Sequence, residues 1–314
     1  MKPAYLAFTL SALVPSVYGW GANGHMTVGF VAMPFLSPKA LSFVQTSLGS
    51  TYNKSLGPAA TWADEVRSQT AFSWSAPLHF VDAEDNPPTS CSVSETRDCS
   101  NGECILTAIA NYTTRVVDQS LSAEQIQEAL KFLGAFMMFL GDITQPLHVE
   151  ALKLGGNDIA ATCSGSSSNL HAVWDSGIIN KLLAANYGNS VNTWANTLVT
   201  RIKTGTYKSI ASSWISCSSI TTPVSSRRSI EEDIFDILVL RPRAITPLEC
   251  PLVWAQDSNA FDCSFVFNFS AGQDLCTSSY FTNAVPIIEQ QIAKGGYRLA
   301  AWLNVLFDGA TNLP

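Results

Sequence analysis

Apolar residues recur three and four positions apart along most of the chain, and strict apolar–polar alternation is sparse. The first spacing is typical of helices that bury one face, and the second indicates strands. Ser37, Pro38 and Gly49 add helix start and stop signals. We therefore predict a mainly α protein with helices over residues 25–36, 37–49, 58–67, 104–119, 122–141, 169–185, 189–204 and 283–307.

The segments between these helices differ in polarity. Residues 77–83 are expected to be extended, 84–103 form a polar loop that contains cysteines, and 164–168 are a Ser-rich linker. The most charged run of the chain predicts a surface insertion around 227–250. No internal repeat is present, so residues 20–314 are expected to fold as one domain with a sizeable core.

Residues 1–19 have the pattern of a secretory signal peptide: an early Lys2, an apolar middle and a small final residue, Gly19. Cleavage there would leave Trp20 as the mature N-terminus. No later apolar run approaches membrane length, so we expect a secreted, extracellular and soluble protein that does not bind membranes.

Composition agrees with that compartment. The eight cysteines contain no C-x-x-C pair, which favours disulfides over a cysteine zinc site, and sequons at Asn53, Asn111 and Asn268 are typical of a secreted glycoprotein. The formal net charge of −7 would not attract nucleic acid. If the protein handles phosphates, metals or local residues must attract them.

All four histidines lie near a carboxylate or near the expected N-terminus. Imidazole and carboxylate groups are suitable zinc ligands, and residues four apart share one face of a helix. Taken alone, each histidine would be interpreted as an ordinary core or surface residue; the shared pattern favours a zinc site. The histidine–partner pairs are His25 with Trp20, His79 with Asp64, His148 with Asp142, and His171 with Asp175.

Several motifs together resemble the fungal S1/P1 nuclease family along essentially the whole mature chain. They are W-G-A-N-G-H at 20–25, T-W-A-D at 61–64, H-F-V-D-A at 79–83, D-N-P-P at 85–88, G-D-I-T-Q-P-L-H at 141–148, G-G-N at 155–157, N-L-H-A-V-W-D at 169–175 and A-K-G-G-Y-R-L-A-A-W-L at 293–303. The resemblance implies a single compact helical domain with three zinc ions in a cleft.

The resemblance also implies the zinc ligands. The sets are the amine and carbonyl of Trp20 with His25 and Asp142; His148, His171 and Asp175; and Asp64, His79 and the shared Asp142 with one more histidine. That last histidine is replaced here by Met138, whose thioether is a weak zinc ligand. Three protein ligands still suit a catalytic zinc, but we expect lower affinity at this site.

Further roles come from the same resemblance. Asp64 would orient or deprotonate a water, and Arg67 would neutralise transition-state charge, although its position also suits a surface helix cation. Phe80 would stack on an unpaired base, and Asp82 would accept a hydrogen bond from the base edge. Without the resemblance, Phe80 would be interpreted as a core residue. Disulfides Cys91–Cys263 and Cys99–Cys104 are implied as well.

The sequence thus predicts a monomeric zinc-dependent endonuclease that cuts single-stranded DNA and RNA to 5′-phosphomononucleotides and also acts on 3′-nucleotides. Two alternatives stay open at this point. One is a degenerate member in which Met138 leaves nucleotide or metal binding with little catalysis. The other is a zinc-dependent phospholipase C-like phosphodiesterase, against which the Phe80–Asp82 pocket argues.

Overall fold

The computed structural model describes residues 20–67, 69–134, 136–218 and 249–314. The predicted signal peptide and most of the predicted insertion around 227–250 lie outside this part of the chain. The described part is mainly helical, as predicted, and none of its helices is long and apolar enough to cross a membrane. The longer helices are α1 (Ala22–Ala32), α2 (Pro38–Leu48), α4 (Trp62–Arg67), α6 (Ile105–Val116), α7 (Ala123–Gly134), α8 (Phe136–Asp142), α10 (Ile178–Asn186), α11 (Val191–Lys203), α13 (Glu249–Phe261) and α14 (Ser279–Asp308).

Short elements connect these helices and carry several of the polar residues of interest. They are the α-helices α3 (Leu56–Ala59), α5 (Glu95–Asp98) and α9 (Leu170–Ala172), the 3-10 helices η1 (Met33–Phe35), η2 (Ser50–Tyr52), η3 (Thr70–His79), η4 (Pro146–Val149) and η6 (Ala211–Ser218), and the π-helical turns η5 (Val173–Gly177) and η7 (Asp262–Val266).

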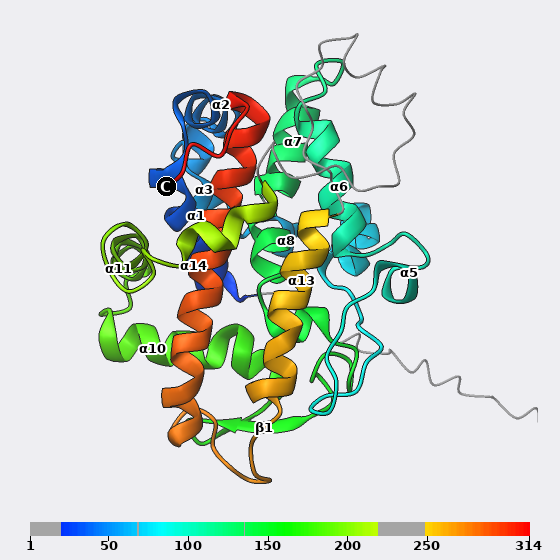
Figure 1. The fold of residues 1–314 in the computed structure, drawn as a ribbon, viewed down its shortest axis with the longest axis vertical. Coiled ribbons are helices and arrows are strands. Elements are labelled where there is room, and N and C mark those ends of the chain that lie inside the picture. The colour runs from blue at the N-terminus through cyan, green and yellow to red at the C-terminus, as the bar shows by residue number, and fades with distance from the viewer. Residues whose placement is uncertain (1–19, 68, 135, 219–248) are drawn as a thin grey trace, which may run out of the picture.

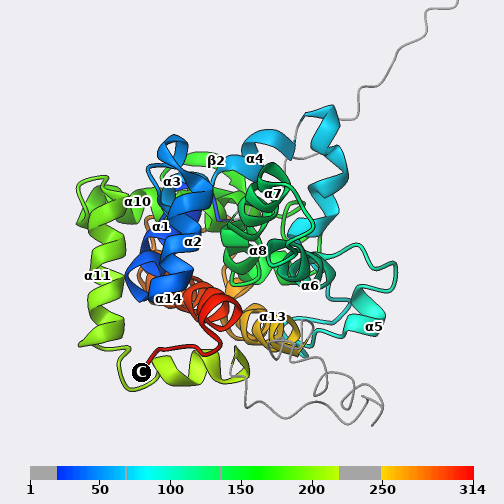
Figure 2. The ribbon, with the colours of Figure 1, turned by 90° about the horizontal axis from the view of Figure 1, so that it is seen from above.

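The long helix α14 is the axis around which the other helices pack (Figure 1). Its side chains are buried almost without interruption from Gln291 to Val305, although an ordinary surface helix buries only one face. Viewed from above, α11 and α6 lie on opposite flanks of α14 (Figure 2). Because α14 also contacts α1 and α8, it links the elements that carry His25 and Asp142.

Gly296 allows α1 to pass very close to α14. A Cβ atom built on Gly296 would lie 2.5 Å from Val31 Cγ1 and 2.7 Å from the Val28 carbonyl oxygen, and both distances are too short for any side chain. The missing side chain therefore sets the spacing of the two helices, and with it the position of His25 on α1.

The helix expected over 122–141 is confirmed by α7 and α8; residue 135, between them, lies outside the described part of the chain. Another predicted helix is divided in the structure. The helix expected over 169–185 begins as α9, widens into the π-helical turn η5 and continues as α10. Such π turns are rare and often lie at functional sites.

Three segments contradict the sequence-based assignment. Residues 77–79, expected to be extended, form the end of the 3-10 helix η3, and the chain is extended only from Phe80 onward. The Ser-rich patch 164–168 is not a linker but part of an antiparallel hairpin of β1 (Ala160–Cys163) and β2 (Ser166–Asn169). Ser164 and Gly165 form its turn with positive φ angles, and both backbone N–H groups donate to the Asp274 carboxylate, a long-range contact invisible in the local pattern. No helix was expected where α13 lies.

Three disulfides join the described parts of the chain. Cys91–Cys263 and Cys99–Cys104 are confirmed. The third bridge, Cys163–Cys276, had not been predicted, and it ties the end of β1 to the loop before α14. Cross-links of such long sequence separation restrict the unfolded chain most.

Candidate metal centre

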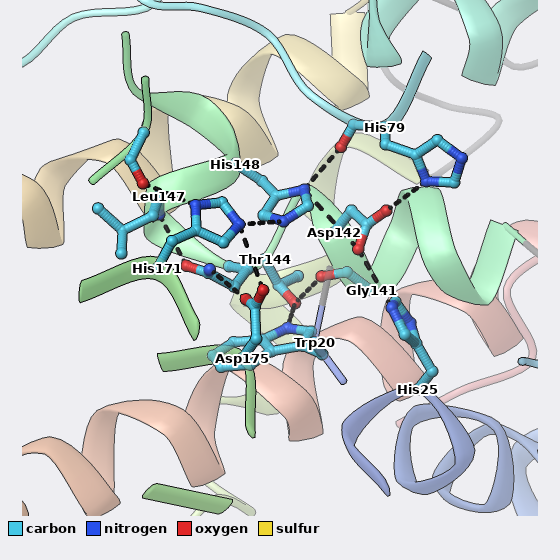
Figure 3. Close-up of polar contacts among 12 residues, drawn as sticks. Trp20, His25, His79, Gly141, Asp142, Thr144, Leu147, His148, His171 and Asp175 are labelled. Carbon is cyan, nitrogen blue, oxygen red and sulfur yellow. Dashed lines mark hydrogen bonds and ion pairs between the residues drawn. The ribbon is translucent and has the colours of Figure 1, made fainter. Parts of the chain in front are cut away.

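Six buried histidine and aspartate side chains converge from separate elements on one polar cluster (Figure 3). None of them is more than 2% exposed. They are His25 on α1, His79 at the end of η3, Asp142 at the end of α8, His148 on η4, His171 on α9 and Asp175 on η5.

His148, His171 and Asp175 form the tightest group, in which one atom from each residue lies within 4.8 Å of the others. The two imidazole Nε2 atoms are 3.0 Å apart, and His171 Nε2 is 3.3 Å from Asp175 Oδ2. Ligand atoms bound to one tetrahedral zinc at ~2.0–2.1 Å are themselves separated by about 3.3 Å. The spacing of the group therefore suits a metal ion.

The outer nitrogen of each imidazole is held by a backbone carbonyl. His148 Nδ1 donates to the His79 oxygen at 2.8 Å, and His171 Nδ1 donates to the Gly155 oxygen at 2.6 Å. These bonds place the proton on Nδ1 and turn the Nε2 lone pairs inward. Two lone pairs facing each other at 3.0 Å repel unless a cation lies near them, so this donor set fits a metal.

Asp142 lies between the other two histidines, with one oxygen toward each of them. Its Oδ1 is 3.3 Å from His25 Nε2, and its Oδ2 is 3.1 Å from His79 Nδ1. The preceding Gly141 permits this arrangement, because a Cβ atom there would lie only 3.0 Å from His25 Nδ1. A carboxylate shared in this way is suited to bridge two metal positions.

Trp20 is buried beside the same cluster. Its indole Nε1 donates to Thr144 Oγ1 at 3.0 Å, and the backbone N–H of the next residue, Gly21, donates to the backbone carbonyl oxygen of Asp175 at 2.8 Å. The first described residue is therefore held against the turn that carries Asp175 (Figure 3).

Gln145 supports the cluster, although no zinc-ligand pattern in the sequence points to it. Its Nε2 donates to Asp175 Oδ1 and its Oε1 accepts from the Leu147 backbone N–H, both at 2.7 Å. The backbone carbonyl oxygen of Thr144, the residue before Gln145, accepts a hydrogen bond from the amide of Gln291 on α14. Gln145 lies within the motif G-D-I-T-Q-P-L-H at 141–148, but the motif does not reveal which residue its side chain contacts.

Comparison with known proteins agrees with this architecture. The profile of the family described as S1/P1 Nuclease matches residues 20–308. The chain belongs to the S1/P1 nuclease family. It is 43% identical to nuclease PA3 of a Penicillium species and to nuclease P1 of Penicillium citrinum, each over 91% of this chain and 97% of the relative. It is 38% identical to nuclease S1 of Aspergillus oryzae, over 94% of each chain.

In this S1/P1 nuclease the predicted base-binding residues lie on one face of an extended segment. Val81 N–H donates to the His148 oxygen, and Val81 and Ala83 point into the core. Phe80, which is partly buried, and Asp82, which is exposed, occupy the alternate positions. Desolvation, followed by the nearby negative charges of other acidic side chains, raises the pKa of Asp82 to about 6.

Three predicted site residues have side chains outside the described part of the chain: Asp64, Arg67 and Met138. Asp64 and Arg67 belong by their backbone to α4, and Met138 belongs to α8, four residues before Asp142. Their proposed roles stay predictions from the resemblance.

Proposed function

We propose that this protein is a zinc-dependent nuclease that hydrolyses single-stranded DNA and RNA to 5′-phosphomononucleotides and also acts on 3′-nucleotides. One observation carries the proposal. One nitrogen or oxygen atom from each of three buried residues, His148, His171 and Asp175, lies within 4.8 Å of the others, in a chain of the S1/P1 nuclease family. Secretion belongs to the same proposal, supported by the signal pattern of residues 1–19 and by the disulfides. A monomeric state stays an expectation from the resemblance.

The described donors fit zinc in chemical type. His148, His171 and Asp175 would hold one ion, and His25, Asp142 and the amine and carbonyl of Trp20 a second. Asp64, His79 and Asp142 would hold the third with fewer ligands because of Met138. Zinc, when bound, acts as a Lewis acid on the phosphodiester and promotes ionisation of water.

The chain's own residues would position the substrate around this centre. Phe80 would stack on a base that has left its partner strand, and Asp82 would accept a hydrogen bond from the base edge. A paired base cannot reach this face without unstacking, which would explain a preference for single strands. Asp64 would orient the attacking water and take its proton, and Arg67 would neutralise charge that develops on the phosphoryl oxygens.

A substrate panel tests the proposal. Zinc-loaded protein is incubated with single-stranded DNA, RNA, duplex DNA, a 3′-nucleotide and phosphatidylcholine vesicles, and the products are identified by mass spectrometry. We expect 5′-phosphomononucleotides from the single strands and far slower cutting of the duplex. Turnover of the lipid alone would support a phospholipase. Zinc-loaded, folded protein that binds nucleotides without turnover would support the degenerate alternative.

A further inference from the structure

Two cysteines outside the three disulfides lie together at the junction of two helices. Cys217 is half-buried near the end of η6, and Cys250 is buried in the first turn of α13. The Cys250 thiol is the main cause that lowers the pKa of Cys217, so the two thiols are neighbours. A disulfide needs an S–S distance of ~2.0 Å, and rotation between side-chain rotamers can bring neighbouring thiols to it.

Arg298 of α14 fixes the two segments against each other. Its Nε donates to the Trp214 oxygen at 3.1 Å, three residues before Cys217. Its guanidinium lies over the ring of Trp254, 5.4 Å from the centroid and four residues after Cys250. Because Arg298 is only 3% exposed, this junction belongs to the rigid core, and the two thiols are held together by the fold.

We propose that Cys217 and Cys250 form a fourth disulfide in the folded protein. The proposal goes beyond the nuclease activity and does not depend on it. Three disulfides elsewhere in the chain show that its cysteines are built for an oxidising compartment. A pair of neighbouring thiols would be oxidised there by the same agents.

The oxidant is a dithiol–disulfide carrier in its disulfide form, such as a protein disulfide oxidase or glutathione disulfide. Half-buried Cys217 meets it first: its thiolate attacks the carrier's disulfide, a mixed disulfide forms, and one carrier thiolate leaves. The Cys250 thiolate then attacks Cys217 Sγ, which forms the new S–S bond and releases the second carrier sulfur. Two protons and two electrons pass from the cysteines to the carrier.

The local charge suits this order of attack. The interaction with the Cys250 thiol, helped by the positive charge of Arg298, outweighs the opposing effect of burial and holds the pKa of Cys217 below its ordinary value, which raises its thiolate fraction. The resulting bond would secure the first turn of α13. That helix carries Asn259, whose amide donates to the Val149 oxygen directly after His148.

Peptide mapping under non-reducing conditions tests the proposal. The purified protein is denatured in acid with N-ethylmaleimide present and digested with trypsin and Asp-N. These proteases release Cys217 in residues 209–227 and Cys250 in residues 244–256, with one cysteine in each peptide. We expect a single cross-linked species two hydrogens lighter than the sum of the two peptides. Cys99–Cys104 serves as the positive control.

Maleimide on both peptides, or Cys217 linked to any cysteine except Cys250, would overturn the proposal. Stability gives a second readout through C217S, C250S and the double variant. If the thiols are bonded, each single substitution should lower Tm as much as the double does, by about 5 °C. Falls in Tm that add would show two thiols that merely pack together.

Discussion

Gln145 should control how tightly the centre holds zinc without being a ligand itself. Its amide donates to Asp175 Oδ1 at 2.7 Å in a fully buried position, so the carboxylate is oriented toward His171. Gln145→Met keeps the length and shape of the side chain but removes both the donor to Asp175 and the acceptor for the Leu147 N–H. The substitution therefore isolates these two hydrogen bonds.

The expected loss follows from these contacts. A hydrogen bond to a charged acceptor contributes about 1.5–3 kcal/mol, and a lost helix-capping bond costs about 1 kcal/mol. We therefore expect the metal-free variant to lose about 3 kcal/mol of unfolding free energy. Loss of a partner behind a metal ligand typically weakens binding about 10–100-fold, which corresponds to about 1.4–2.7 kcal/mol.

Zinc content measured against a series of buffers of fixed free zinc gives the affinity, and thermal unfolding of the stripped protein gives the stability. Gln127→Met is the matched control, because the Gln127 amide donates to the Ser47 oxygen at 2.6 Å on α7, which carries none of the site residues. Gln127→Met should lower the free energy of unfolding by about 1 kcal/mol and leave the zinc affinity unchanged. Equal zinc affinity in Gln145→Met and the unaltered protein would refute the supporting role of Gln145.

Four further predictions follow from the same site and core. An extra residue left ahead of Trp20 should lower zinc content and activity, since its amine could no longer act as a ligand; equal activity after intact-mass verification would count against the amine. Met138→His should retain zinc more tightly and hydrolyse single-stranded DNA faster, and an unchanged rate would mean that position 138 does not face the metals. Lowering the pH through about 6 should raise KM for single-stranded DNA, because Asp82 gains a proton and stops accepting a hydrogen bond from the base. Asp82→Asn should make KM independent of pH in this range. If KM of the variant still rises, another group causes the pH dependence. Asp257→Asn should lower the free energy of unfolding by about 3 kcal/mol, because Lys294 and Arg298 stay buried without the carboxylate that pairs with them. Burial opposes ionisation of Asp257, but Arg298 and Lys294 outweigh it and lower the pKa. The Tm difference from the unaltered protein should therefore be full above about pH 4 and shrink below it; a pH-independent difference would contradict this.

The sequence was sufficient for the parts of the fold that depend on local periodicity. The predicted helix 189–204 is α11, and 283–307 lies within α14, because each has an uninterrupted apolar stripe. The β1–β2 hairpin was missed because its turn is stabilised by Asp274, more than a hundred residues away. Helix α13 was missed because Pro251 lies in its first turn and the helix begins at the edge of the segment that the charge pattern marked as an insertion.

In the candidate site, too, local spacing was informative and tertiary contacts were not predictable. The spacing of four residues indicated that His171 and Asp175 lie on one helix face, and the structure places His171 Nε2 3.3 Å from Asp175 Oδ2. Which histidine meets Asp142 is decided by packing: Gly141 and Gly296 bring α1 close enough for His25 to reach that carboxylate. The carbonyl partners of His148 and His171, and the amide of Gln145, are tertiary contacts that no local pattern specifies.

The most direct test is to strip the correctly processed protein with chelator, restore zinc stepwise, and follow bound zinc and hydrolysis of single-stranded DNA in the same samples. We predict that activity disappears on stripping and returns with bound zinc, whereas His171→Ala regains little of either. Hydrolysis that persists in fully stripped protein, or zinc that returns to a folded protein without hydrolysis, would contradict a zinc-dependent nuclease built on this cluster.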